Sequence, residues 1–435
     1  MNKIFISFTS LLIWLVSLQS NCFGQGQHSK FDVKSYELKL EVNIAEKSIQ
    51  GELLIGLEAE VGINSIALDA RNLIIDELSG SEVASYHQHD SKLIIELSES
   101  HQTRQEIHIR YHGNPARGLL FNSDLEQVHT VYFTEDWMPC HFIPADKAKL
   151  SLKLLIPKEK VCIASGELKG KEEKGDKTLY SWQQNYESPA YTYGFVIGTF
   201  TKVQEEFKDV TLNYYSAKLS KTELKKVFEE TYSMLQFFEE KTGIPYVQRT
   251  YSQVLIGGNF QEISGMAVFN TSYSHAVFKD SSEIHLTAHE LAHQWWGNMI
   301  TCEDFGHFWL NEAFAVYMAT AFNECRFGKG KYESDIALYK GIYDDVKKRG
   351  KDKALVFKKW VSTIDNRNVV YYKGAYVLHL LREEIGEEAF WKGIKSYTKN
   401  NWGGTVNTEH FQVEMEKVSG IDLDTFFKKW VYSAS

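Results

Sequence analysis

The spacing of hydrophobic residues changes once along the chain. From about Gln27 to Phe200, hydrophobic and polar residues alternate, as in YELKLEVN at 36–43. This period of two is typical of strands that bury one face. Similar runs are SKLIIEL (91–97), QEIHIRY (105–111) and KLSLKLLIP (149–157), and GELKGKEEKGDKTLYSW (166–182) predicts two strands around a charged turn. We therefore predict an N-terminal β-rich domain, a sandwich or saddle of sheets, over residues 25–204.

After Phe207 the hydrophobic spacing becomes helical. The stretch TELKKVFEETYSMLQFFEEKTG (222–243) predicts one helix, with Ser220 or Thr222 as its N-cap and Gly243 as its terminator. The stretches AYVLHLLREEIG (375–386) and NTEHFQVEMEKVSG (407–420) also predict helices. The second domain, residues 205–435, should be mainly helical, so the fold class is α+β with two domains.

Composition supports a large globular enzyme or binding protein. A chain of 435 residues with 43 % hydrophobic residues is expected to form two domains with sizeable cores. Its formal net charge of −9 argues against nucleic acid as a partner, because phosphate binding needs clustered Lys and Arg. The sequence leaves the oligomeric state open.

The first residues resemble a targeting segment. Lys3 precedes an apolar run from Ile4 to Leu18, and small residues at Cys22 and Gly24 follow. This order is typical of a secretory signal peptide, so we expect residues 1–24 to be removed and the protein to be exported to the periplasm, the medium or the cell surface. Retention as a membrane anchor is the alternative, although the run is short for a stable span. An oxidising compartment would permit disulfides, whose pairing the sequence does not determine.

Three histidines recur at four-residue intervals in HLTAHELAHQWW (285–296). Residues four apart on a helix share a face and can bind one ion, whereas residues eight apart lie roughly 12 Å apart along the axis. His285 and His293 therefore cannot ligate the same metal while the helix is intact. Glu290 favours the pair His289 and His293, because a carboxylate directly after the first ligand can activate a water molecule. Asp280, with Glu283 three residues later, is the predicted start of this helix.

A third ligand is expected from GHFWLNEAFAVYMA (306–319). Glu312 lies in a second strongly apolar helical pattern, with room for a turn between it and His293. Two histidines and one glutamate bind one Zn²⁺ and leave a position open, which is a catalytic arrangement. His275, His285, His307 and His379 are expected to pack or to lie at the surface.

These residues resemble a known family. HELAHQWWGN followed by WLNEAFA is similar to the zinc aminopeptidases of the aminopeptidase N family, which are gluzincin metallopeptidases. SPAYTYGFVIGTF, WMPCHFIPADKAKL and YYKGAYVL resemble further segments of that family, so the resemblance covers nearly the whole chain after residue 24. It implies a thermolysin-like catalytic domain, with His289, His293 and Glu312 as zinc ligands and Glu290 as general base. It also implies that Tyr371 hydrogen-bonds the oxyanion. The neighbouring Tyr372 is not expected to take this role.

The family's amine-binding motif, Gly–x–Met–Glu–Asn, is altered in GGNFQEISGMAVFN (257–270). One alignment puts Ala267 in place of the glutamate. The other matches Glu262, Gly265 and Met266 to the family's Glu–x–x–Gly–apolar continuation. We favour the second, in which Glu262 binds the substrate's α-amino group and Gly258 and Gly265 flank it in the substrate-binding segment. The resemblance further implies a second amine contact from the β domain, for which Glu135 is the nearest candidate.

The end of the sequence, FKKWVYSAS, resembles the end of the family's catalytic domain. We therefore expect a short form without the C-terminal helical domain, whose cleft is open or is covered by a partner or a second copy. The expected activity is removal of N-terminal residues from peptides with a free N-terminus. The alternatives are a zinc endopeptidase, if Ala267 holds the motif position, and a zinc-stabilised binding protein without catalysis. Side-chain preference is not readable from the sequence.

Overall fold

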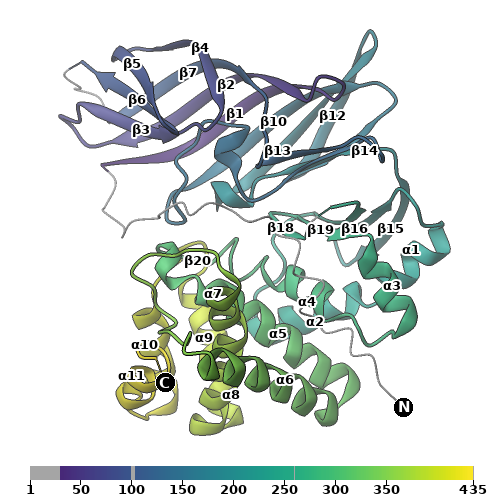
Figure 1. Cartoon of the computed structure of the whole chain (residues 1–435), viewed down its shortest axis with the longest axis vertical. Helices are drawn as coiled ribbons and strands as arrows, with labels where there is room; N and C mark the ends of the chain where they lie inside the picture. Colours follow the sequence, from purple (N-terminus) through teal and green to yellow (C-terminus); the bar gives the residue numbers. More distant parts are fainter. Residues whose placement is uncertain (1–29, 99–102, 259, 435) are drawn as a thin grey trace.

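The computed structural model describes residues 30–98, 103–258 and 260–434. A β domain is stacked on a mainly helical domain (Figure 1), and the β domain comes first in the sequence. This confirms the predicted α+β class with two domains in that order. The predicted signal peptide, residues 1–24, lies outside the described residues.

The β domain is built on a seven-stranded sheet. From one edge to the other its strands are β12 (Glu167–Lys174), β13 (Lys177–Pro189), β10 (Lys147–Pro157), β1 (Phe31–Asn43), β2 (Ser48–Ala59), β7 (Arg104–Gly113) and β4 (Leu73–Gly80). In β1, Tyr36 and Leu38 are buried while Glu37 and Lys39 are exposed. The alternation seen in the sequence is therefore a division between a buried and a solvated face.

Two smaller sheets complete this domain. One has the order β3 (Ser65–Asp69), β6 (Lys92–Leu97) and β5 (Val83–His89), and the other has the order β11 (Val161–Ala164), β14 (Phe195–Gly198), β9 (Gln127–Thr130) and β8 (Leu119–Asn122). The short 3-10 helices Thr134–Asp136 and Ala190–Thr192 follow β9 and β13. The segment after β9 brings the β domain to the candidate site described below.

The second domain opens with a five-stranded sheet, which the sequence reasoning did not foresee. Its order is β15 (Thr201–Phe207), β16 (Val210–Ser216), β17 (Thr250–Ile256), β19 (Met266–Asn270) and β18 (Gln261–Ile263). β17 lies parallel to both neighbours and is buried almost throughout. A central strand buried on both faces lacks the polar alternation that marks a half-buried strand, so its period is not readable.

The single helix predicted for 222–243 is two helices, α1 (Lys221–Val227) and α2 (Thr231–Thr242). Ser220 forms the N-terminal capping box with Glu223, and Gly243 ends α2 in a left-handed conformation, as predicted. The helical path breaks at the buried Phe228, whose ring packs 5.3 Å from that of Tyr214. Packing onto the sheet has overridden the local helical preference here.

The predicted start of the histidine-bearing helix was wrong. α3 (Ser272–Lys279) ends just before Asp280, and the Asp280 carboxylate accepts hydrogen bonds from the backbone and hydroxyl of Ser282 at 2.9 and 2.8 Å. Asp280 thus stabilises a turn between two helices, and α4 (His285–Ala292) begins at Ile284 without a side-chain cap.

The remaining elements are mostly helices. They are α5 (Trp309–Phe327), α6 (Lys329–Lys348), α7 (Ile364–Asn368), a π-helix (Val369–Lys373), α8 (Gly374–Ile385), α9 (Glu387–Asn400), α10 (Thr408–Ser419) and α11 (Asp424–Trp430), with the 3-10 helix Phe305–His307 and the strands β20 (Thr301–Cys302) and β21 (Thr405–Val406). Across the described ranges, none of the helices combines the length and the hydropathy needed to cross a bilayer. In the same ranges the cysteines Cys140, Cys162, Cys302 and Cys325 are unpaired, and the first three are buried.

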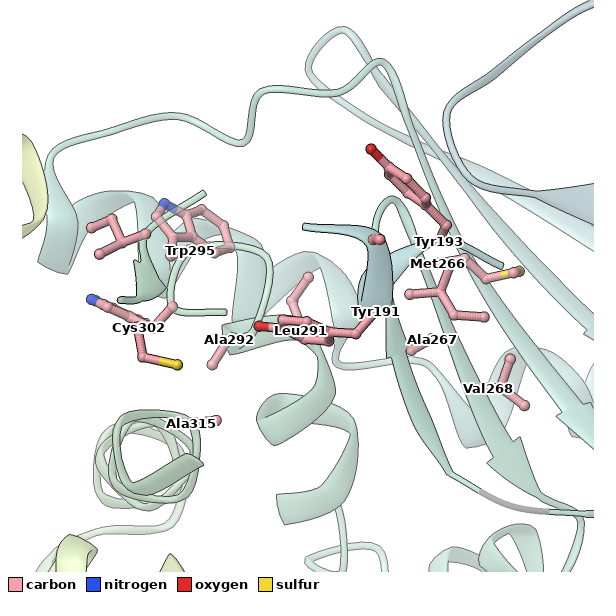
Figure 2. Close-up of a cluster of buried hydrophobic side chains, with 14 of the residues drawn as sticks. Tyr191, Tyr193, Met266, Ala267, Val268, Leu291, Ala292, Trp295, Cys302 and Ala315 are labelled. Atoms are coloured by element: carbon pink, nitrogen blue, oxygen red, sulfur yellow. The ribbon is translucent and has the colours of Figure 1, made fainter. Parts of the chain in front are cut away.

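The two domains share hydrophobic core at the place where α4 meets β19. Figure 2 shows Tyr191 and Tyr193 of the β domain beside Met266 and Ala267 of β19, with Leu291 of α4 in the same cluster. All five side chains are at most 3 % exposed. Helix α4, which carries His289, is therefore packed against both the β18–β19 hairpin that carries Glu262 and the β domain.

Candidate active site

Three predicted ligands come together in the second domain. His289 and His293 project from α4 and its C-terminal end, and Glu312 lies in the first turn of α5. The two Nε2 atoms are 3.1 Å apart, and they lie 3.6 and 3.4 Å from Glu312 Oε2. The three side chains are at most 9 % exposed, and both Glu312 oxygens lack a hydrogen-bond partner among the described residues.

The charges at this cluster suit a divalent cation. Burial raises the pKa of Glu312, but the charge of His293 and the hydrogen bonds from His289 and His293 together lower that pKa to about 2, so the carboxylate is ionised. His293 Nδ1 lies 3.0 Å from the carbonyl oxygen of Trp296, which favours a proton on Nδ1 and leaves Nε2 to face the cluster. Two imidazole nitrogens and one buried, unpartnered carboxylate form the His₂Glu donor set that binds Zn²⁺ with a position left open.

Glu290 lies beside the cluster without belonging to it. Its carboxylate, the Glu262 carboxylate and the His293 ring offer polar atoms within 4.8 Å of one another. Glu290 is 4 % exposed, and its Oε2 has no hydrogen-bond partner in the described ranges. Burial, followed by the negative charge of Glu262, raises the pKa of Glu290 well above 4.5. A buried carboxyl group with a raised pKa suits proton transfer.

Glu262 reaches the site from the β18–β19 hairpin. It pairs directly with Ala267 across the two strands, so both side chains leave the same face of the hairpin. The two alignments considered for the amine motif therefore point to one place in the fold, and the carboxylate there is that of Glu262. Burial raises its pKa to about 7.

A buried glutamine at the end of helix α4 is hydrogen-bonded to this hairpin. Gln294 directly follows His293, and its Oε1 accepts a hydrogen bond from the Gly265 amide at 2.9 Å. Its Nε2 donates to the Ile263 carbonyl oxygen at 3.1 Å. Gly265 has φ = +77°, which the tight turn between the strands requires and glycine adopts without strain. Gly258 lies against the His129 ring, since a Cβ there would come within 2.6 Å of it.

Tyr371 and Tyr372 take different directions from the π-helix. The Tyr371 ring lies parallel to that of His289, with centroids 6.0 Å apart, and Tyr371 is half-buried. Tyr372 is buried and stacks on Tyr339 of α6 instead. The structure brings Tyr371 to the cluster and leaves Tyr372 in the packing behind it. π-helical turns are often found at functional sites.

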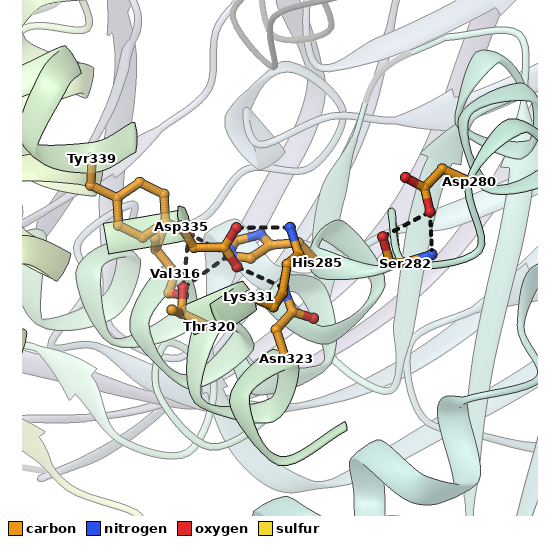
Figure 3. Close-up of polar contacts among 9 residues, drawn as sticks. All are labelled: Asp280, Ser282, His285, Val316, Thr320, Asn323, Lys331, Asp335 and Tyr339. Carbon is orange, nitrogen blue, oxygen red and sulfur yellow. Dashed lines mark hydrogen bonds and ion pairs between the residues drawn. The ribbon is translucent and has the colours of Figure 1, made fainter. Parts of the chain in front are cut away.

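His285 belongs to a polar network behind the cluster (Figure 3). Its Nε2 lies 2.8 Å from the Tyr339 hydroxyl and 3.3 Å from the Thr320 hydroxyl, and these two hydroxyls are 2.8 Å apart. Its ring lies parallel to that of His289 at 6.5 Å. Asp335 of α6 accepts hydrogen bonds from Asn323 and Lys331 in the same network. This network joins α4, α5 and α6.

The other histidines also lie outside the cluster. His307 hydrogen-bonds to Thr408, His379 lies 2.9 Å from the Tyr332 hydroxyl, and His275 is exposed.

The β domain contributes a residue that the sequence reasoning missed. The hydroxyl of Tyr132 donates to Glu262 Oε1 at 2.5 Å. Glu135, the predicted contact, instead pairs with Arg117 at 2.6 Å, so that prediction was wrong. The error has a physical cause, because the chain makes a tight turn at Tyr132, where φ is +31°, and a bulky residue rarely adopts such a backbone. Sequence patterns do not reveal this turn.

Comparisons with known proteins agree with this site. The model of the peptidase family M1 domain matches residues 227–430, and the model of the peptidase M1 N-terminal domain matches residues 33–192. The chain belongs to the M1 peptidase family. Among curated relatives of this M1 chain, aminopeptidase M1 of Arabidopsis thaliana is 22 % identical over 94 % of the chain and 51 % of its own length. A leucyl aminopeptidase of Saccharolobus solfataricus is 23 % identical over 92 % of the chain and 53 % of its own length.

Solved structures share the two-domain M1 fold. An M1 zinc metallopeptidase from Deinococcus radiodurans superposes with a TM-score of 0.78 at 20 % identity, covering 95 % of each chain. A mutant of that enzyme, bound to a Tyr-Ser-Ala substrate, superposes with a TM-score of 0.79 at 20 % identity, covering 93 % of this chain and 95 % of the other. The M1 chain described here thus spans about half the length of the curated relatives and nearly the whole of the solved two-domain chain.

Proposed function

We propose that this M1 chain is a zinc-dependent aminopeptidase, which removes N-terminal residues from peptides. The observation that carries the proposal is the position of Glu262, whose carboxylate lies within 4.8 Å of polar atoms of Glu290 and His293. A carboxylate this close to the hydrolytic residues is placed to bind the α-ammonium group of the residue being removed. The names of the relatives support the same activity.

His289, His293 and Glu312 would hold one zinc ion. When bound, zinc would supply Lewis acidity for the scissile carbonyl and for the attacking water. Glu290 takes a proton from the attacking water and delivers it to the leaving amine. Its burial keeps bulk water from competing for that proton.

Tyr371 and Glu262 act on the substrate. The Tyr371 hydroxyl donates a hydrogen bond to the oxygen of the scissile carbonyl as negative charge develops on it, so the contact strengthens in the transition state. Glu262 accepts charge-assisted hydrogen bonds from the α-ammonium group. Together these two contacts fix the first peptide bond, rather than an internal one, at the reacting position.

A direct test compares a free peptide with its N-acetylated form. We expect stepwise loss of N-terminal residues from the free peptide by mass spectrometry, no cleavage of the acetylated form, and loss of activity with a chelator that zinc restores. Equal cleavage of both forms would support the alternative of a zinc endopeptidase. Absence of cleavage with zinc bound would support a zinc-stabilised binding protein. Neither alternative is favoured, because Glu262 lies at the site and Glu290 and Tyr371 are both present there.

Export is a further proposal, which rests on the sequence of residues 1–24 alone. Expression of the whole chain in a bacterial host, followed by N-terminal sequencing of exported protein, tests it. A mature chain that begins at Gln25 supports cleavage, whereas an intact N-terminus in the membrane fraction supports retention as an anchor. Coverage of the cleft by a second copy is tested by sizing the purified protein.

A further inference from the structure

A pocket lies between the β domain and the segment that leads into the β18–β19 hairpin. Its volume is about 610 Å³, which is within the usual range for a ligand pocket. Leu119 and Phe121 of β8 and His129 of β9 line it on one side, and Gly257 and Gly258 line it on the other. We call it the β8 pocket. Within the described ranges, the metal cluster is not part of its lining.

His129 is a buried polar side chain of this pocket. It is 3 % exposed, and neither ring nitrogen has a hydrogen-bond partner among the described residues. Burial lowers the pKa of His129 to about 4, so near pH 7 the ring is neutral and offers one N–H donor and one acceptor. Buried polar groups are nearly always paired in folded proteins. An unpaired ring in the wall of a pocket therefore indicates a ligand that supplies the missing hydrogen bonds.

The space beside His129 depends on glycine at position 258. A Cβ on Gly258 would lie 2.6 Å from the Cε1 and Nε2 atoms of the His129 ring, closer than a real Cβ approaches another atom. The Gly258 carbonyl oxygen accepts a hydrogen bond from the Asn270 side chain, which holds the backbone in this position. Glycine therefore allows the segment to pass close to the imidazole.

The β8 pocket and the candidate active site lie at the two ends of one surface. Strand β9 and the segment 257–262 follow each other in the same direction, because hydrogen bonds join them at three places. These contacts are those of Gln127 Oε1 with the Gly257 amide at 3.2 Å, of the Gln261 side chain with the Thr130 carbonyl and the Tyr132 amide at 2.8 and 2.9 Å, and of the Tyr132 hydroxyl with Glu262 Oε1 at 2.5 Å.

The chain limits the distance between the β8 pocket and Glu262. The three residues from His129 to Tyr132 span at most about 11 Å, and the four residues from Gly258 to Glu262 span at most about 14 Å. An extended peptide advances about 3.3 Å per residue. A peptide whose first residue is held at Glu262 therefore reaches the pocket with its third, fourth or fifth residue.

The lining of the β8 pocket favours a large apolar side chain. Leu119 and Phe121 form apolar walls, and His129 is neutral. The exposed rim carries both Lys47 and Asp124, so the charges there do not favour a ligand of either sign. A charged side chain would lose its hydration in the pocket without gaining an ion pair at the apolar walls. An apolar side chain would be buried there, while a peptide group beside it pairs with the imidazole.

We propose that the β8 pocket is a substrate subsite, which binds a large apolar side chain of the third, fourth or fifth residue of the peptide. This inference rests on the proposed aminopeptidase function and names its substrate class, peptides longer than two residues with an apolar residue downstream of the cleaved bond. Leu119 and Phe121 cover the side chain, and His129 hydrogen-bonds the peptide backbone.

The test measures kcat/KM for release of the first residue from a set of synthetic peptides. The set contains dialanine and hexaalanine peptides in which Phe or Asp replaces the third, fourth or fifth residue. At one of these positions we expect Phe to raise kcat/KM at least about 10-fold over both dialanine and the Asp peptide, because a large apolar side chain becomes buried. The ratio of kcat/KM for this Phe peptide to that for dialanine is the readout for variants.

Two variants change the pocket and one matched variant does not. Phe121→Asp places a charge in the half-buried apolar wall, and His129→Phe removes both ring nitrogens while keeping a ring. The control is His112→Phe on β7, where the histidine lies 2.8 Å from Asp76 and outside the pocket. We expect the ratio to fall at least about 10-fold in Phe121→Asp and roughly 5-fold in His129→Phe. The control should keep the wild-type ratio.

The outcomes separate this inference from the proposed function. If the wild type releases no first residue from any of these peptides, the aminopeptidase function fails and the inference fails with it. If it cleaves dialanine and all the hexapeptides with equal kcat/KM, only the inference fails. A folded Phe121→Asp protein that keeps the wild-type ratio would also overturn the inference, and this half-buried position decides the matter if His129→Phe does not fold.

Discussion

Replacing Glu290 with glutamine should abolish turnover while making the metal-free protein more stable. The Glu290 and Glu262 carboxylates offer oxygens within 4.8 Å of each other in a buried site. Both groups have raised pKa values, so the melts are compared at pH 9, where ionisation of both is favoured; two like charges at that distance repel by about 3 kcal/mol at an effective dielectric constant of 20. Glutamine keeps the shape, removes the repulsion and can donate a hydrogen bond to Glu262. We expect a gain of about 1–3 kcal/mol, or roughly 1–3 °C in Tm for a chain of this length.

The same change removes the proton acceptor from the site. General acid–base groups contribute about 10²- to 10⁴-fold to rate, so kcat of Glu290→Gln should fall by at least about 100-fold. Zinc content, measured by mass spectrometry, should stay at one per chain, because Glu290 is not a ligand. Thermal melts are run in chelator, where no metal charge offsets the repulsion. Glu283→Gln, a matched change just before α4, should keep both turnover and Tm. A Tm below that of the wild type, or near-normal turnover, would refute the reasoning.

Three further predictions concern other parts of the molecule. Glu312→Gln should lower zinc affinity at least about 10-fold, because it removes the anionic ligand, and competition with a chromogenic chelator measures this. Lys147→Met should lower Tm by several degrees and expose the domain junction to protease, because it removes hydrogen bonds between the domains. The buried Lys147 amine donates to carbonyls of the second domain, those of Met299, Gly403 and Gly404, at 2.6, 3.1 and 3.4 Å. Burial raises the pKa of Glu135 from 4.5 to about 8, so the folded state retains a proton that the unfolded state loses, and wild-type stability falls as pH rises through this window. Glu135→Gln should therefore gain stability relative to the wild type between pH 5 and 8 and match it below about 4.5. Denaturant unfolding at several pH values measures the difference. A difference in unfolding free energy between the two proteins that does not change with pH would contradict the prediction.

The metal cluster could be predicted because its geometry is local. The four-residue interval between His289 and His293 is a property of one helix, and Glu312 begins the next long apolar helix. Several strands of the β domain, such as β1, β6, β7 and β10, could be predicted equally well, since each buries mainly one face. The sheet formed by β15 to β19 was missed, in part because its central strand β17 is buried on both faces and so loses the alternation that marks a strand.

The amine-binding side of the site depends on contacts that no single segment contains. The sequence favoured Glu262 but left the alternative alignment on Ala267 open, and the hairpin pairing shows that both alignments lead to one face, where the carboxylate is that of Glu262. Tyr132 was missed because its position depends on a left-handed turn that is enforced from the other domain by Gln261. Glu135 was the candidate instead because the resemblance implies a glutamine or glutamate in this segment, although its own partner is Arg117.

Removal of one residue at a time requires a fixed distance between the amine contact and the hydrolytic group. In this structure buried hydrogen bonds maintain that distance. Gln294 joins the hairpin of Glu262 to the helix of His293, and Gln261 joins the same hairpin to the turn at Tyr132. Because Gln261 and Gln294 are buried, a shift of either would leave polar atoms without partners, at a cost of about 1–3 kcal/mol each. The spacing is therefore held on both sides of Glu262, which is the property that would confine cleavage to the first peptide bond in the proposed aminopeptidase.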